Sequence, residues 1–197
     1  MRTKILTVSN FIIVINIIVF IITMNNGQSE NALGLYYAGG VAPISLFRDH
    51  EVYRLFTSMF LHSGIRHIFN NMFMLFFMGN ILECELGKVK YVILYLLSGI
   101  IGGIISQLYY YAIGDKFVVC VGASGAIFGI LGGLVWLLIV NKGYVGDLSL
   151  RRMILYIVVS IALGMSSSNV SVSAHIGGLV SGFGLAIPLY RKRGYNL

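Results

Sequence analysis

The chain has 197 residues, of which 57% are apolar and only 11% are charged. A soluble domain usually carries roughly 25% charged residues, so this composition excludes an ordinary water-soluble protein and indicates one that resides in a lipid bilayer. The net charge is +7, but the basic residues stand between apolar runs without interleaved aromatics, which argues against a nucleic-acid-binding protein. The length predicts one domain, residues 1–197.

Six apolar runs follow one another along the chain, separated by polar segments. A helix that crosses a bilayer needs about 17–25 such residues. We therefore predict an all-α polytopic bundle of six transmembrane helices. The fifth is short, and Ser166, Ser167 and Ser168 can complete its span. The predicted helices cover residues 8–24, 65–82, 91–113, 117–140, 153–165 and 174–190.

The basic residues predict how the bundle is oriented, because cytoplasmic connections are enriched in Lys and Arg. With both termini inside the cell, four basic residues lie outside (Arg48, Arg54, Arg66 and Lys116) and ten inside (Arg2, Lys4, Lys88, Lys90, Lys142, Arg151, Arg152, Arg191, Lys192 and Arg193). We expect the plasma membrane, cytoplasmic termini and an external connection over residues 25–64. Apolar and aromatic residues in this connection predict that it packs on the bundle or lies in the membrane interface.

Polar residues gather at one depth of this bundle. The second, fourth and sixth helices all run inward from the external side, and near their starts lie His67 and Asn71, Ser124, and His175. At a rise of about 1.5 Å per residue, each lies within roughly 10 Å of the outer end of its helix. Ionisable residues inside a membrane are costly and are functional candidates. The topology thus predicts a site close to the external surface.

Ser124 is the candidate nucleophile of this site. Gly122 and Gly125 flank it and allow a sharp turn into a helix whose N-terminus favours developing negative charge. His175 is the candidate base, and Phe128, one turn after Ser124, can stack on its ring. The alternative interpretations are a small-residue cluster that only packs helices and a histidine with a structural hydrogen bond.

Small residues predict that the fourth and sixth helices pack closely, as in many membrane bundles. Such packing is needed because a serine hydroxyl is activated only within about 2.6–3.2 Å of its base. The two expected faces are Gly178 and Gly182 on the sixth helix, and Gly125, Gly129 and Gly133 on the fourth.

His67 and Asn71 are four residues apart and share one helix face. Both can donate hydrogen bonds to a tetrahedral oxyanion, together with the Ser124 amide. The alternatives are interhelical bonding for Asn71 and an interfacial position for His67. His62 is expected in a loop or at the interface. No acid is suitably located for a triad and no HExxH pattern occurs, so we predict a Ser124–His175 dyad without metal or cofactor.

These motifs resemble those of the rhomboid family of intramembrane serine proteases. The resemblance rests on GASG at 122–125, AHIGGLVSG at 174–182, and HIFNN, which contains His67 and Asn71. Tyr53-Arg54 and the Gly79…Glu83 pair extend it over about residues 50–185. In the family the first of the Tyr53-Arg54 pair is usually Trp, a departure that concerns the loop and not the chemistry.

The resemblance implies a six-helix core with a water-filled active site that opens to the outer side. It implies that Ser124 attacks, that His175 is the general base, and that His67, Asn71 and the Ser124 amide form the oxyanion hole. Arg54 and Glu83 are implied to be structural. The expected substrates are single-pass transmembrane proteins, cut near the outer membrane boundary at helix-destabilised sites. The alternatives are a catalytically silent protein that binds transmembrane helices and a small transporter, for which neither midplane polar groups nor repeated halves are present.

Overall fold

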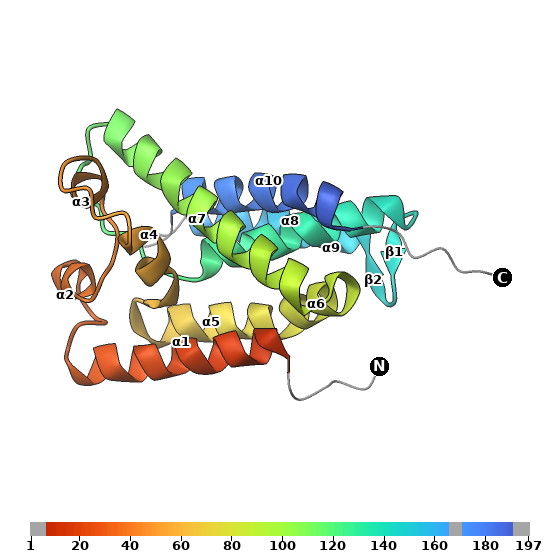
Figure 1. Ribbon diagram of the computed structural model, residues 1–197, viewed down its shortest axis with the longest axis horizontal. Coiled ribbons are helices and arrows are strands. Elements are labelled where there is room, and N and C mark those ends of the chain that lie inside the picture. Colours follow the sequence, from red (N-terminus) through yellow and green to blue (C-terminus); the bar gives the residue numbers. More distant parts are fainter. Residues whose placement is uncertain (1–6, 166–170, 191–197) are drawn as a thin grey trace.

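The computed structural model describes residues 7–165 and 171–190, and most of them are helical (Figure 1). One long helical segment is built from three pieces: α5, the π-helical η2 and α6. In chain order the long segments of the described chain are α1 (Val8–Asn25), α5–η2–α6 (Gly64–Met74, Leu75–Gly79 and Asn80–Leu86), α7 (Lys88–Ala112), α8 (Ser124–Val140), α9 (Leu150–Met165) and α10 (Val172–Leu189).

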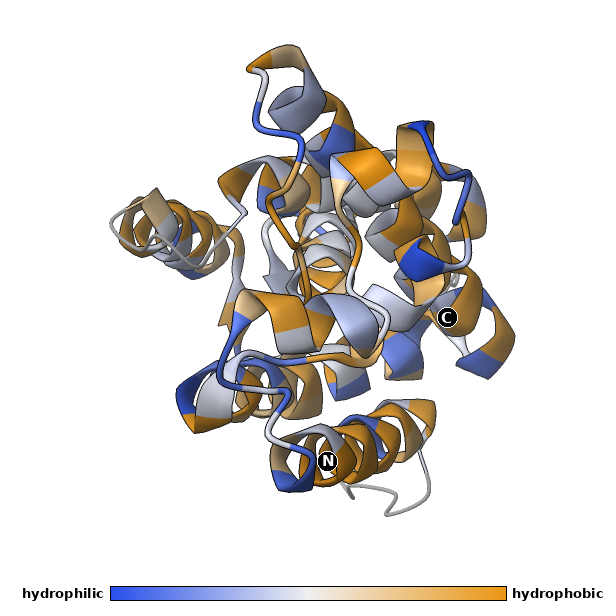
Figure 2. Ribbon diagram, turned by 90° about the vertical axis from the view of Figure 1, so that its left-hand side faces the viewer, coloured by the Kyte–Doolittle hydropathy of each residue, from blue (hydrophilic) through white to orange (hydrophobic). Residues whose placement is uncertain are grey.

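Helix α8 lies at the centre of the bundle. Of its 17 residues, 12 are buried, and Leu134, Leu137 and Leu138 are fully enclosed. Helices α7 and α10 pack against it most extensively. The surrounding helices direct apolar side chains outward, as Phe11 on α1 and Val180 on α10 illustrate with 66% and 64% exposure. Figure 2 shows this apolar colouring on the outer faces of the helices. A helix that is apolar on its exposed face is suited to a lipid surround.

The structure supports fewer membrane spans than the six that the sequence predicts. In the described chain, three helices are long and apolar enough to cross a membrane: α1, α7 and α10. Helix α8 is apolar but shorter. The helical fold and its several spans are therefore confirmed, whereas the count of six stays a prediction.

The connection between α1 and α5 is folded rather than extended. It contains α2 (Ala32–Tyr37), α3 (Pro43–Phe47), α4 (Arg54–Thr57) and the 3₁₀ turn η1 (Ser58–Phe60). Val41, Leu46 and Leu55 form a small core that packs on α7. The connection is therefore packed by its own side chains, as compact long loops commonly are.

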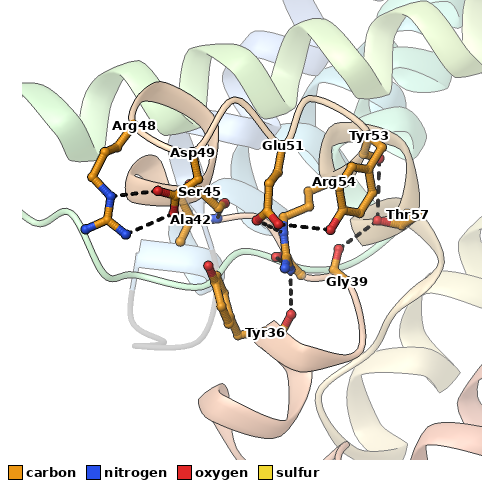
Figure 3. Close-up of polar contacts among 11 residues, drawn as sticks. Tyr36, Gly39, Ala42, Ser45, Arg48, Asp49, Glu51, Tyr53, Arg54 and Thr57 are labelled. Atoms are coloured by element: carbon orange, nitrogen blue, oxygen red, sulfur yellow. Dashed lines mark hydrogen bonds and ion pairs between the residues drawn. The ribbon is translucent and has the colours of Figure 1, made fainter.

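Arg54 links the parts of this connection (Figure 3). Its guanidinium is buried, donates 2.6 Å to Glu51 and 2.9 Å to the Gly40 carbonyl, and also donates to the Tyr36 carbonyl. It lies 4.3 Å from the centre of the Tyr36 ring. A buried arginine requires such partners, because a charge removed from water is costly when unpaired.

The prediction that the fourth helix begins at residue 117 is wrong, because α8 begins at Ser124. The preceding backbone is extended: Cys120 and Val41 exchange hydrogen bonds of 2.8 and 3.2 Å in an isolated β-bridge. Gly122 then adopts a φ of +123°, which is incompatible with a helix and is tolerated by glycine alone among common residues.

Two further differences concern the region after α8. The fifth helix begins at Leu150 rather than 153, directly after a hairpin that the sequence did not reveal, in which β1 (Tyr144–Val145) pairs antiparallel with β2 (Leu148–Ser149). Gly146, at a φ of +57°, permits the tight turn between these strands. The predicted extension of the fifth helix at Ser166, Ser167 and Ser168 lies outside the described residues.

Glu83 joins α6 to the first turn of α1. Its carboxylate is buried and accepts hydrogen bonds from the amides of Val8 and Ser9, at 2.9 and 2.8 Å, and from the Ser9 hydroxyl at 2.9 Å. The first amides of a helix have no partner within the helix, and a carboxylate there also interacts favourably with the helix dipole. Glu83 thereby fixes the start of α1 against the bundle.

We predict that Glu83→Ala destabilises the protein by about 1.5–3 kcal/mol, since hydrogen bonds to a charged acceptor are lost and buried donors remain. Glu83→Gln should lose less, because one acceptor oxygen remains. Thermal unfolding in detergent measures both. Glu85→Gln, on the same helix, is the matched control and should unfold as the parent does; an unchanged midpoint for Glu83→Ala would contradict this role.

Candidate active site

The start of α8 is held by the connection that precedes α5. The Gly122 amide donates 2.9 Å to the Ser58 carbonyl in η1. The chain then turns through Gly122 and enters the helix at Ser124. As a consequence, the first amides of α8, including that of Ser124, are not used by helical hydrogen bonds and can serve an anion.

His67 and Asn71 of α5 face this turn. A Cβ atom on Gly122 would lie 2.8 Å from His67 Cε1 and Nε2 and 3.6 Å from Asn71 Nδ2. The other ring nitrogen of His67, Nδ1, lies 3.1 Å from the hydroxyl of Ser63. Asn71 Nδ2 is buried and without a hydrogen-bond partner among the described residues. The side chains of His67 and Asn71, both possible hydrogen-bond donors, therefore approach Gly122, two residues before Ser124.

His62 is more enclosed than the sequence suggested. It does precede α5 in a non-helical link, but it is fully buried rather than interfacial. Its ring packs edge-on against that of His67, with the centres 5.1 Å apart. Burial lowers the pKa of His62 far below its ordinary value, so the ring is neutral at pH 7. Its contact supports the His67 ring from behind.

Helices α8 and α10 approach until their backbones touch. A methyl group on Gly178 would collide with the Gly125 carbonyl, and one on Gly182 with the Gly129 carbonyl. The expected glycine contact is thus present for these four residues. Gly133 is the exception, because it faces Leu82 and Leu94 on α6 and α7.

Gly132 takes the place expected of Gly133 on the α10 side, since a methyl group there would collide with the Leu179 carbonyl. The two residues are adjacent on α8 and point about 100° apart, as the helical repeat requires. The glycine face of α8 therefore shifts by one residue along its length.

His175 lies one turn into α10 and is buried. The helix begins at the N-cap Ser171, whose side chain accepts from the Ala174 amide at 3.3 Å and lies 2.6 Å from the Ser106 hydroxyl of α7. The His175 ring stacks on Phe128, with centres 4.1 Å apart and planes 11° apart. Backbone capping and stacking together fix the ring beside α8.

The starts of α8 and α10 meet at residues adjoining Ser124 and His175. The Ala174 carbonyl lies 3.7 Å from where a Cβ of Gly125 would be. Among the described residues, no hydrogen bond joins the Ser124 hydroxyl to the His175 ring, and His175 Nδ1 has no partner. The cavity beside Gly132 and Leu179 and the pocket beside Ala42 and Arg48 are both lined by other residues. The described part of the chain holds no group of three or more His, Cys, Asp or Glu suited to a metal ion.

Three serines that support the site were not identified from the sequence: Ser58, Ser63 and Ser171. Ser171 carried a signal, because Ser shortly before an apolar helix is a typical N-cap. Ser58 acts through its carbonyl oxygen, which any residue would supply, so no pattern could have revealed it.

Comparison with known proteins agrees with this architecture. Residues 49–192 match the Rhomboid domain. The Rhomboid protease GluP of Bacillus subtilis (strain 168) is 33% identical over 183 residues, 93% of this chain and 35% of that protein. RHOMBOID-like proteins 1 and 4 of Arabidopsis thaliana are 36% and 33% identical, over 78% and 84% of this chain.

The chain spans only 35–41% of the length of these three relatives. The match to the Rhomboid domain nevertheless covers most of the chain. The chain therefore belongs to the rhomboid family, as its motifs suggested, and is a multi-pass membrane protein.

We predict that Gly178→Ala destabilises the protein by about 1–3 kcal/mol, because the added methyl group forces α10 away from the Gly125 carbonyl. The matched control is Gly184→Ala on the same helix, where a Cβ meets nothing within 4 Å. The midpoint of thermal unfolding in detergent should fall for the first variant and hold or rise for the second. Equal midpoints would show that the helices do not depend on this contact.

Proposed function

We propose that this protein is an intramembrane serine endopeptidase that hydrolyses peptide bonds in or near transmembrane segments. One observation carries the proposal: His67 and Asn71 face Gly122, and the start of α10 with His175 packs against Gly125 and Phe128, on either side of Ser124. Nucleophile, base and oxyanion donors are the three components that acyl transfer needs. Membership of the rhomboid family supports the same activity.

In the proposed mechanism, Ser124 Oγ attacks the scissile carbonyl while His175 accepts its proton. His175 then protonates the leaving amine, and an acyl-enzyme remains on Ser124. Water, deprotonated by His175, hydrolyses the ester and restores the dyad. The Ser124–His175 hydrogen bond forms when substrate binds, as catalytic hydrogen bonds are often long in resting enzymes. Stacking on Phe128 keeps the imidazole oriented through each of these proton transfers.

The tetrahedral intermediate carries an oxyanion that His67, Asn71 and the Ser124 amide would stabilise. The unpartnered Asn71 Nδ2 supports this role, because a buried donor without an acceptor is costly and gains one only when the oxyanion forms. The backbone amide of Ser63 donates to His67 Nδ1 at 3.4 Å, which favours a tautomer with the proton on Nε2, the nitrogen nearest Gly122.

The proposal includes the membrane arrangement. Six helical segments would span a cell membrane with both termini cytoplasmic and with the folded connection before α5 on the external side. Ser124 would then lie near the outer surface, in a pocket reached by water, and single-pass transmembrane proteins would be the substrates. Extended backbone before Ser124 is compatible with membrane depth where its polar groups are paired within the protein, as Cys120 is paired with Val41.

We predict that a fluorophosphonate probe labels the protein in detergent and that Ser124→Ala and His175→Ala each abolish the labelling. Ser181→Ala is the matched control, because this hydroxyl lies on α10 and bonds only to the Gly177 and Gly178 carbonyls. A silent helix-binding protein or a transporter would not be labelled. Labelling that survives Ser124→Ala would refute the nucleophile.

We predict that Asn71→Ala lowers kcat for a single-pass substrate by about 10²–10³-fold, the usual loss for one oxyanion donor. Asn70→Ala is the matched control, since Asn70 is the adjacent residue and is exposed. Single-turnover cleavage in proteoliposomes separates kcat from binding. A loss confined to KM would assign Asn71 to substrate binding instead.

A further inference from the structure

A cavity of about 340 Å³ lies between α8, α9 and α10, away from Ser124. Every lining residue is apolar or glycine. Gly132 and Ile157 are buried, whereas Val158 and Val180 are 58% and 64% exposed, so the cavity leads from the bundle core to the outer surface. Helix α9 contacts both α8 and α10 beside this cavity.

An apolar space of this size favours an apolar occupant. Protein interiors are packed densely, and atoms that line a void lose dispersion contacts. Water gains nothing there, because no polar partner is available. A helix, about 10–12 Å across with its side chains, is too wide for the space, whereas a flexible chain of methylene groups fits it.

The basic residues beside the cavity indicate which kind of molecule carries such a methylene chain. Arg151 and Arg152 lie in the first turn of α9, and both are exposed. Arg151 shares a helix face with the cavity residues Ile154 and Val158, at spacings of three and seven. In the part of the chain that the structure describes, no ion pair joins either arginine to a carboxylate. Basic groups beside a crevice between transmembrane helices are typical of sites for anionic lipid headgroups.

We propose that this cavity binds an acyl chain of an anionic glycerophospholipid whose phosphate headgroup contacts Arg151 and Arg152. The lipid fills the space behind α9 and fixes that helix against α8 and α10. Helix α9 needs such support, because among its described residues only Met153, Ile157 and Gly164 are buried. The site depends on the chain spanning a membrane and does not depend on proteolysis.

The test uses the full chain in phosphatidylcholine nanodiscs that contain a trace of photoactivatable lipid, with a diazirine midway along one acyl chain. Phosphatidylglycerol and phosphatidylcholine forms of the probe are compared, and the labelled peptides are mapped by mass spectrometry. We expect the phosphatidylglycerol probe to label residues 154–158 and 179–183 several-fold more than the phosphatidylcholine probe.

Variants separate the two halves of the site. Arg151→Gln and Arg152→Gln should each lower the preference for phosphatidylglycerol about fivefold, which corresponds to roughly 1 kcal/mol for each basic residue at an anionic surface. Val180→Phe should block the cavity and reduce labelling by both probes. The matched controls are Lys88→Gln and Val89→Phe at the start of α7, and both should label as the parent does.

Equal labelling by the two probes would overturn the headgroup contact, and so would a preference that survives both arginine substitutions. Labelling spread evenly over the outer faces of α1 and α7 would overturn the cavity as a binding site. Both arginines are exposed, so their variants are expected to fold, and thermal unfolding of the same nanodiscs verifies this. Phosphatidylglycerol should raise the midpoint of the parent more than that of the arginine variants.

Discussion

The close approach of α8 and α10 is the constraint on which the rest of the molecule depends. In a bilayer, apolar side chains gain little by leaving lipid for protein, so helices associate through tight packing of small residues. Here Gly178 meets the Gly125 carbonyl and Gly182 meets the Gly129 carbonyl, and no larger residue fits either position. Because Ser124 precedes Gly125 and His175 precedes Gly178 by one turn, the same contact brings the candidate nucleophile and base to one end of the helix pair.

A second constraint acts on the backbone before Ser124. The segment at 118–121 is extended, its Cys120 pairs with Val41, and the amide of the following Gly122 is bonded to Ser58. The folded connection before α5 therefore does more than cover the bundle. It supplies the hydrogen-bond partners that hold this segment as far as the turn at Gly122. Arg54 is the buried centre of that connection. Arg54 binds the Gly40 carbonyl, the next residue Val41 pairs with Cys120, and Arg54 thereby helps to position Ser124 four residues further on.

The sequence predicted the long helices well because a transmembrane helix is recognisable as an apolar run with polar ends. It also placed His67, Asn71 and His175 near the start of the fourth helix, and their contacts at Gly122 and Phe128 agree with this placement, whereas their roles and their depth in a membrane stay predictions. It failed where hydrogen bonds outweigh hydropathy. The apolar residues 117–123 resemble a helical turn, yet the bridge between Cys120 and Val41 and the positive φ of Gly122 keep them out of the helix. The spacing of the glycines could not reveal that Gly132, and not Gly133, faces α10, since both residues continue a small-residue pattern.

A structure of the protein after reaction with a fluorophosphonate would show whether these groups act together, because the phosphonyl oxygen mimics the oxyanion. We expect a bond between phosphorus and Ser124 Oγ. We also expect the phosphonyl oxygen about 2.7–3.1 Å from the Ser124 amide, Asn71 Nδ2 and His67 Nε2, with the His175 ring in contact with Oγ. An adduct on another residue, or a phosphonyl oxygen directed away from His67 and Asn71, would contradict this expectation.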